Sequence, residues 1–216
     1  IRMINSFTAF DFETANDKKS SICQVGFVRF ENGIIMEKWS SLVNPEDDFH
    51  SKNIAIHGIR PENVINCPTF PDIFPIIKEK LTTNISISHT NFDPLALEDS
   101  IRRYNLSLFP YQWLDNCEVA RNVWPQFRSH SLNSLFKKLN LPNYQAHDAL
   151  DDAIICGHIF ISAIKENKAH VEKLTKSLNL RDTNKLKLKR VNKIKGHSDF
   201  FSKIMRKQVS VKANPS

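Results

Sequence analysis

Two carboxylates, Asp11 and Glu13, lie within the apolar stretch SFTAFDFET near the start of the chain. The stretch is predicted as a strand over residues 6–14. Side chains two residues apart on a strand point to the same face, so both acids crowd one face. An unpaired buried carboxylate is costly. A positive charge is therefore expected beside this strand, and the fold of the rest of the chain must allow for it.

Hydrophobic periodicity predicts the remaining elements. Residues 31–33, ENG, form a turn that predicts a hairpin, and Thr69 is a predicted N-cap. Three consecutive strands followed by alternating helices and strands indicate an α/β sheet with a hairpin-built edge, covered on both faces by helices. The predicted strands are residues 6–14, 21–30, 33–43, 84–89 and one from 111 that runs into a short helix; the predicted helices are 69–81, 92–106, 131–141 and 147–164, and residues 44–53 form a loop.

The net charge of +7 is unevenly distributed. Residues 165–216 hold 15 Lys and Arg against 4 Asp and Glu, a net of +11, whereas the first 164 residues have a net of −4. We therefore predict a globular domain over residues 1–166 and a Lys-rich C-terminal extension over 167–216, either a helical arm or a flexible tail. A basic tail beside an acidic body suggests a polyanionic partner. A solvated extension that only aids solubility is the alternative.

Several classes of protein are disfavoured by composition. No apolar run approaches the roughly 18–20 residues needed to cross a bilayer, and the first residues, IRMINSF, lack the apolar core of a signal peptide. The four cysteines are scattered, which favours reduced thiols. With five glycines, the chain shows no Gly-rich phosphate loop. We therefore expect a cytoplasmic protein with no membrane contact.

Two further acids lie in segments where a carboxylate is unfavourable. Asp93 follows the predicted strand 84–89, and Asp152 lies within the last predicted helix. Strand ends and a packing helix can converge on one site in an α/β sheet, where four carboxylates would repel and raise one another's pKa values. Mg²⁺ or Mn²⁺, two ions per site, would relieve that conflict. Taken singly, each acid is more often a cap or turn residue, and we expect Asp148 and Asp151 to fill such roles.

The three acidic segments together resemble the motifs of a known family. They read FDFETA, SHTNFDPLAL and HDALDDA, with His147 five residues before Asp152. This arrangement resembles the DEDDh 3′–5′ exonucleases of the ribonuclease H-like superfamily, which include the epsilon proofreading subunit of DNA polymerase III, ribonuclease T and oligoribonuclease. The resemblance covers about residues 5–164. It implies a mixed five-stranded sheet flanked by helices, with the basic C-terminal extension outside it.

The resemblance also implies a role for each acid. Asp11, Glu13 and Asp152 would hold one metal ion, Asp11 would bridge to the second, and Asp93 would support that second ion. Water would attack the terminal phosphodiester and release a nucleoside 5′-monophosphate. His147 would be the general base, since an imidazole pKa near 6.5 suits proton removal near neutral pH.

Contacts to the terminal nucleotide follow from the same resemblance. They would come from backbone groups around Phe12 and Thr14 and from His57 and Ile59. The last two residues lie in the segment IHGI, residues 56–59. One departure stands out. The second motif commonly has a His five residues before its Asp, as part of His-Asn followed by three residues, whereas His89 lies four residues before its Asp. No role is therefore carried over to His89.

Several functions stay open from the sequence alone. The first is a metal-dependent 3′–5′ exonuclease acting on single-stranded DNA or RNA. The second is an RNA-trimming exoribonuclease of the ribonuclease T type. The third is a catalytically silent nucleic-acid-binding module. All five catalytic positions are filled, which argues against this third function. The expected partners are a nucleic acid 3′ end and either a DNA polymerase or a second copy of the chain.

Overall fold

The computed structural model describes residues 4–141, 146–176 and 180–181. The chain divides into two units, Ile1–Arg181 and Asp182–Ser216. The second unit lies outside the described residues, and with it most of the Lys-rich extension predicted at 167–216. The fold below is that of the first unit.

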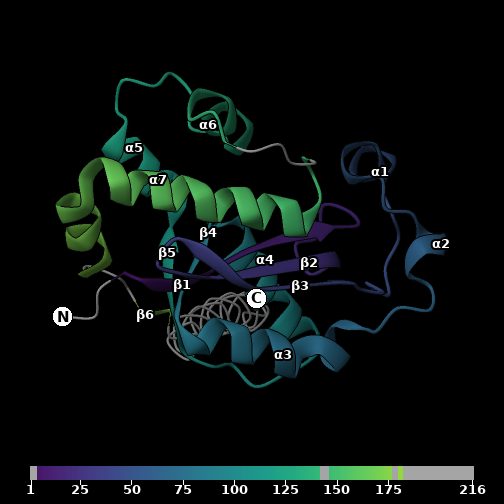
Figure 1. The fold of residues 1–216 in the computed structure, drawn as a ribbon. Coiled ribbons are helices and arrows are strands. Elements are labelled where there is room, and N and C mark those ends of the chain that lie inside the picture. The colour runs from purple at the N-terminus through teal and green to yellow at the C-terminus, as the bar shows by residue number, and fades with distance from the viewer. Residues whose placement is uncertain (1–3, 142–145, 177–179, 182–216) are drawn as a thin grey trace, which may run out of the picture. The chain divides into compact units, whose positions relative to one another are not determined.

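A mixed sheet forms the centre of this unit (Figure 1). The first three strands form an antiparallel meander, and β4 and β5 run parallel to β1. All five predicted strands are confirmed. A sixth, two-residue strand pairs antiparallel with β5; a strand this short has no periodicity to predict it. In the sheet order β3-β2-β1-β4-β5-β6 the strands are β1 (Ser6–Thr14), β2 (Ile22–Glu31), β3 (Ile34–Leu42), β4 (Ile85–Ser88), β5 (Tyr111–Asp115) and β6 (Leu180–Arg181).

Helices cover both faces of the sheet, as predicted. Thr69 precedes α3 as the expected N-cap, and its backbone N–H donates to the Asp72 carboxylate at 2.7 Å. Two short helices, α1 and α2, were not predicted, and α1 begins inside the predicted loop. The helices are α1 (Ser51–His57), α2 (Pro61–Val64), α3 (Phe70–Thr83), α4 (Phe92–Arg103), α5 (Asn116–Val123), α6 (Leu132–Lys138) and α7 (Ala149–Lys176).

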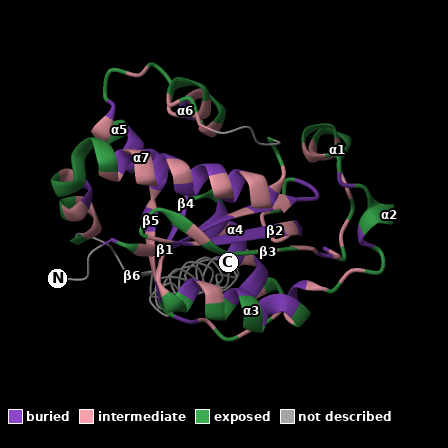
Figure 2. Ribbon diagram, viewed as in Figure 1, coloured by how far each residue is buried: buried purple, intermediate pink, exposed green. Residues whose placement is uncertain are grey.

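The two faces of β1 belong to different layers of the core (Figure 2). Phe7 and Ala9 pack with the buried side of α7, whereas Phe10 and Phe12 pack with α3 and α4. Because side chains alternate along a strand, the odd-numbered acids of β1 lie on the α7 side. The sheet thus presents them to the helix that carries Asp152.

The first turn of α7 lies directly on β2. A Cβ atom at Gly26 would be 2.2 Å from the Ala149 carbonyl oxygen, a distance that no side chain allows. Gly26 is also the β2 residue paired with Asp11. The absence of a side chain at this one position therefore lets the start of α7 approach the neighbour of the β1 acids.

The later part of α7 crosses the predicted domain boundary. The helix continues to Lys176, and its helical geometry is interrupted at Asn167 (φ −150°, ψ 76°). The boundary at 166/167 therefore falls at an irregularity within one helix and stays a prediction. Among the described residues, no helix combines the length and apolarity needed to span a membrane.

Candidate active site

Four carboxylates converge at the carboxyl end of β1. Asp11 and Glu13 are partly buried on that strand. Asp93 comes from the first turn of α4 and Asp152 from the first turn of α7, and their exposed fractions are 3% and 8%. The charges of Asp93, Asp152 and Glu13 raise the pKa of Asp11, as expected for neighbouring groups. The structure thus brings together acids that are more than a hundred residues apart in the chain.

A backbone hydrogen bond holds Asp93 against β1. Its Oδ1 accepts from the N–H of Phe12 at 3.1 Å. Phe12 lies between the two β1 acids, so the bond fixes Asp93 beside both. The Phe12 ring is 3% exposed and packs in the core. The ring therefore serves the fold, and its backbone N–H is already engaged.

His147 lies at the rim of the cluster. Its backbone N–H donates to Asp152 Oδ2 at 3.2 Å, and its side chain is exposed. Its φ is +66°, a left-handed conformation that is uncommon for residues other than glycine. One donor atom from each of Glu13, His147 and Asp152 lies within 4.8 Å of the others. The turn before α7 thus places an imidazole next to two of the acids.

Burial and the charges of nearby acids raise the pKa of every acid in the cluster. Burial is the larger cause for Glu13, whose pKa rises to about 8, with Asp152 and Asp93 adding to the rise. Burial likewise raises the pKa of Asp93 and of Asp152 to about 7, although backbone hydrogen bonds oppose the rise. The pKa of Asp11 lies well above its usual range, first through burial and then through the charges of Asp93, Asp152, Glu13 and Asp148. All four groups therefore favour protonation or a bound cation.

The donor set fits a hard divalent cation. Among the described residues, no Lys or Arg forms an ion pair with any of the four acids. The buried Oδ1 of Asp152 has no hydrogen-bond partner within that part of the chain. Oxygen donors crowded in this way are the ligands that Mg²⁺ and Mn²⁺ prefer. An unpartnered buried oxygen on one of these clustered acids is the feature that a metal ion would satisfy.

Gln24 and Asp148 fasten the start of α7 to the sheet. Gln24 Nε2 donates to Asp148 Oδ2 at 2.8 Å, and Gln24 Oε1 accepts from Ala149 N–H at 3.2 Å. Asp148 Oδ1 accepts from the N–H groups of Leu150 and Asp151 at 3.0 and 3.1 Å. The predicted capping role of Asp148 is therefore confirmed.

Gln24 was not anticipated from the sequence. Gln24 lies opposite Glu13 in the β1–β2 register. Pairing the two predicted strands residue by residue would have placed Gln24 beside this acid. Its position next to a cluster acid means that one side chain sets the distance between β2 and the turn that carries His147.

A second segment closes the other side of the strand end. We call residues 44–59 the arm. The Thr14 carbonyl oxygen accepts from Asn53 Nδ2 at 2.8 Å and from His57 Nε2 at 3.2 Å, and His57 Nδ1 accepts from Ile59 N–H at 3.0 Å. The His57 ring is therefore neutral, and burial is the main reason that its pKa is lowered. Thr14, His57 and Ile59 lie together where nucleotide contacts were predicted.

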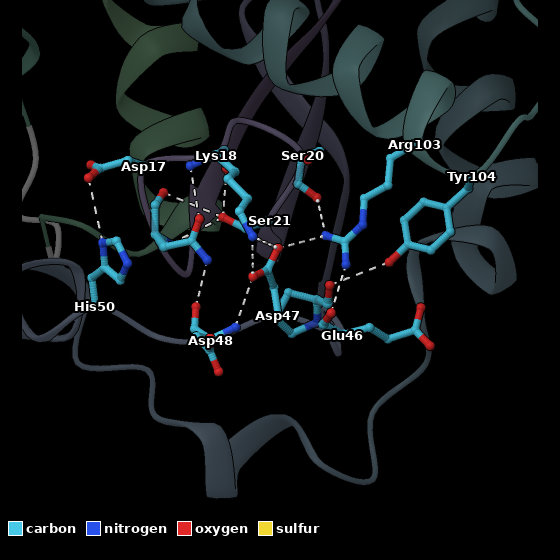
Figure 3. A network of polar contacts seen from close by, with 12 residues as sticks. Asp17, Lys18, Ser20, Ser21, Glu46, Asp47, Asp48, His50, Arg103 and Tyr104 are labelled. Carbon is cyan, nitrogen blue, oxygen red and sulfur yellow. Dashed lines mark hydrogen bonds and ion pairs between the residues drawn. The ribbon is translucent and has the colours of Figure 1, made fainter.

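Polar contacts hold the arm in place (Figure 3). Asp47 accepts from Lys18 Nζ at 2.8 Å and from Arg103 Nη1 at 3.2 Å. Arg103 also donates to the carbonyls of Glu46 and Ser20, at 2.7 and 3.2 Å. The arm is thus joined both to the turn between β1 and β2 and to the end of α4, whose other end carries Asp93.

His89 has a structural contact rather than a place in the cluster. Its Nε2 lies 2.9 Å from the His130 carbonyl oxygen, and burial lowers its pKa to about 4. The neutral ring therefore fastens the turn after β4 to the segment between α5 and α6.

Sequence comparisons identify relatives of the chain. The RNase_T family model, described as Exonuclease, matches residues 8–160. The chain is 29% identical over 160 residues to DNA polymerase III subunit epsilon of Aquifex aeolicus, covering 74% of the chain and 77% of that protein. It is 28% identical over 182 residues to the PolC-type DNA polymerase III of Thermotoga petrophila, covering 82% of the chain. The chain spans only 13% of the length of that polymerase.

Solved structures share the fold. Exonuclease X in complex with 5′ overhanging duplex DNA has a TM-score of 0.63 and 23% identity, and the match covers 79% of the chain and 98% of that protein. The nuclease domain of 3′hExo, a DEDDh family member bound to rAMP, has a TM-score of 0.67 and 18% identity, covering 82% and 96%. The family model includes all five predicted catalytic positions. Because the family model matches most of the chain, the chain belongs to this exonuclease family, and it shares the fold of these solved structures.

Proposed function

We propose that the chain is a metal-dependent 3′–5′ exonuclease that hydrolyses the terminal phosphodiester of single-stranded DNA or RNA and releases nucleoside 5′-monophosphates. The observation that carries the proposal is the cluster of Asp11, Glu13, Asp93 and Asp152, which has no basic partner among the described residues and lies next to the imidazole of His147. Repulsion of this size is retained only where a ligand relieves it. A polyanionic substrate makes a divalent cation the appropriate ligand.

The four acids would hold two ions, Mg²⁺ or Mn²⁺, with Asp11 as the shared ligand. When bound, the ions would supply the positive charge that activates water and stabilises the leaving oxygen. Asp93 and Asp152 are already fixed by the N–H groups of Phe12 and His147. Asp152 keeps a second carboxylate oxygen, Oδ1, for a ligand. The chain therefore holds two of the four donors in place before any ion arrives.

His147 would act as the general base. Its ring is exposed, whereas its backbone is fixed to Asp152, so the ring can receive a proton from water and pass it to solvent. The same hydrogen bond keeps the imidazole within reach of the cluster. His147 thus combines access to solvent with a fixed attachment.

Thr14, His57 and Ile59, with the backbone at Phe12, would contact the terminal nucleotide. His57 presents a neutral ring that is fixed from both nitrogens. A neutral, rigid ring contacts a sugar or base without competing for the metal ions. These contacts would orient the terminal phosphodiester towards the acids.

The test is incubation of 5′-labelled DNA and RNA oligonucleotides, side by side, with Mg²⁺, with Mn²⁺ and with EDTA. We expect stepwise shortening from the 3′ end that disappears with EDTA and in Asp11→Ala or Asp152→Ala. His147→Ala is expected to keep metal binding and lose most of the rate. A protein that shortens neither oligonucleotide with either metal would refute the enzyme assignment and leave the silent binding module. RNA shortened in strong preference to DNA would favour the exoribonuclease.

A proofreading role is the second candidate, because the sequence relatives are the epsilon subunit and PolC-type forms of DNA polymerase III. In that case the partner is a DNA polymerase rather than a second copy of the chain, and the location is cytoplasmic. Residues 167–216 would then be a connection to that partner or a nucleic-acid-binding arm. Co-purification with the replicative polymerase, and its loss on truncation after residue 181, tests this role.

A further inference from the structure

Basic residues are used differently on the two flanks of the site. On the arm side, Lys18, Lys52 and Arg103 each form an ion pair with an aspartate. On the other side, Arg121, Arg128, Lys137 and Lys138 are all exposed. Within the described residues, none of these four forms an ion pair. We call residues 116–141, which include α5 and α6, the basic flank.

The basic flank differs in charge from the domain that carries it. It contains four Lys and Arg against one acid, Glu118, whereas the first 164 residues have a net charge of −4. A cluster of four carboxylates repels a polyanionic substrate, so binding of that substrate requires positive potential close by. Unpaired cations are the ones available for that purpose, because a paired cation is already neutralised.

A contact inside the basic flank links one of its cations to the loop after α5. Lys138 Nζ lies 4.5 Å from the centre of the Phe127 ring, and that ring stacks on Trp124 at 6.0 Å. Arg128 follows Phe127 in the chain. The contact therefore joins the end of α6 to the loop that leaves α5, and makes one surface of two helices and their connection.

The same surface is attached to the edge of the sheet where the acids lie. The His89 ring Nε2 lies 2.9 Å from the carbonyl oxygen of His130. The N–H of Cys117 donates to the carbonyl oxygen of His89, also at 2.9 Å. His89 lies four residues before Asp93. The charge of Arg121 contributes to the low pKa of His89, after burial, which places Arg121 near this turn.

Figure 1 shows α5 and α6 beside the outer side of α7, whose first turn carries Asp152. The basic flank is therefore joined to the site through α7 as well as through the turn after β4.

We propose that the basic flank binds the phosphates of the substrate strand upstream of its 3′-terminal nucleotide. This inference rests on the proposed function, since it gives the active site a path for the rest of the strand. Arg and Lys contacts to phosphate carry no sequence information, so the flank adds affinity that is independent of sequence. The ligand class is a single-stranded nucleic acid backbone.

The test compares a long substrate with a short one. Lys137→Gln/Lys138→Gln, and the same pair combined with Arg121→Gln/Arg128→Gln, are assayed on a single-stranded oligonucleotide and on the p-nitrophenyl ester of thymidine 5′-monophosphate. The ester occupies only the catalytic end of the path. We expect the ratio of kcat/KM for the oligonucleotide to kcat/KM for the ester to fall about tenfold or more in the fourfold variant. The salt dependence of oligonucleotide binding, measured by fluorescence anisotropy, should weaken by a slope of about 3 if four phosphate contacts are lost.

A matched control is available on β3 and α3. Lys38→Gln/Lys78→Gln removes two exposed lysines away from the active site and the basic flank, and so removes the same charge as Lys137→Gln/Lys138→Gln. We expect the control to keep the wild-type ratio and salt slope. Equal losses in the two pairs would overturn the proposal in favour of net charge alone. Unchanged values in the fourfold variant, or displacement of the oligonucleotide by poly-glutamate at equal charge concentration, would overturn it as well.

Failure of the proposed function is distinguishable from failure of this inference. A wild-type protein that does not hydrolyse the ester has no catalytic site of the proposed kind. Anisotropy in EDTA then still decides whether the basic flank binds nucleic acid, since that reading requires no turnover. Tight binding lost in the fourfold variant supports the flank, and equal binding in both proteins refutes it.

Discussion

Asp47 in the arm and Asp152 in the cluster show opposite electrostatic behaviour. Burial would raise the pKa of Asp47, but the hydrogen bond from Lys18 and the charges of Lys18 and Arg103 lower it below its ordinary value. Asp152 has acidic neighbours instead, and burial with those neighbours raises its pKa to about 7. The acid of the arm is satisfied within the chain. The acid of the cluster is not, and this difference separates a structural carboxylate from one that is available to bind a ligand.

The basic residues repeat this division. The cations around the arm neutralise its acids and fasten it to β1, β2 and α4. The cations of the basic flank have no such partner among the described residues. Charges paired within the chain should therefore affect stability when changed, whereas unpaired charges should affect catalysis or binding.

The largest expected effect comes from neutralising one acid of the cluster. Asp11→Asn should lower kcat by about 10³-fold or more, because the shared donor is lost. The same change should raise the melting temperature of the metal-free protein, because it removes repulsion from Asp93, Asp152 and Glu13. Steady-state kinetics and thermal melts in EDTA measure the two effects. Loss of both activity and stability would show that Asp11 is structural after all.

The next effect concerns the attachment of α7. Gln24→Glu removes the donor to Asp148 and adds a repelling charge, and a shift of the His147 turn of about 1 Å would cost about 10²-fold in kcat. Gln24→Glu/Asp148→Asn restores the contact with donor and acceptor exchanged. We expect kcat to recover in the double variant while KM changes little throughout. Independent, additive losses would refute the pairing.

A smaller effect is expected in the arm. Asp47→Asn should lower the free energy of unfolding by about 1–3 kcal/mol, because two cations lose their charged acceptor. This corresponds to about 2–4 °C in Tm per kcal/mol for a chain of this size. Most of the wild-type kcat should be kept. A loss of kcat similar to that of Asp11→Asn would abolish the distinction between the two groups of acids.

The smallest effect is a dependence of stability on pH. An acid whose pKa is raised in the folded state stabilises below its unfolded pKa and loses that contribution as pH rises through the folded value. With folded pKa values of about 7 for Asp93 and Asp152 and about 8 for Glu13 and unfolded values of about 4, the metal-free protein should lose stability as the pH rises from about 4 to about 8. Asp47 acts in the opposite sense, and its contribution is lost only in acid.

Glu13→Gln separates these contributions. It should flatten the decline in Tm over this pH range in EDTA and leave the acid limb unchanged. A decline as steep as that of the wild type would mean that the cluster acids do not titrate in this range.

The sequence predicted what depends on local pattern. Apolar periodicity predicted the five strands of the sheet and the helices that cover it, and spacing singled out Asp11, Asp93 and Asp152. The contact of Gln24 with Asp148 joins residues 124 positions apart, and it depends on the close approach of α7 to Gly26. Such an approach becomes visible only once the helix lies on the sheet.

Two other features escaped prediction for related reasons. The α1 helix has no buried residues, so it shows no apolar stripe. The anchoring of the arm by Lys18, Asp47 and Arg103 involves side chains whose pattern resembles any charged surface. Their partners are set by the packing of α4 and of the turn between β1 and β2, and not by neighbours in sequence.

The most direct measurement is the melting temperature of the metal-stripped protein during titration with Mn²⁺. If the cluster acids are ligands, the wild-type Tm should rise with each addition, and the stabilisation should reach about 2.7 kcal/mol at a hundredfold excess over the dissociation constant. Asp11→Asn should begin at a higher Tm in EDTA and respond little, whereas Asp47→Asn should begin lower and respond as the wild type does. A wild-type Tm that does not change, or an equal rise in Asp11→Asn, would contradict the assignment of these carboxylates to metal.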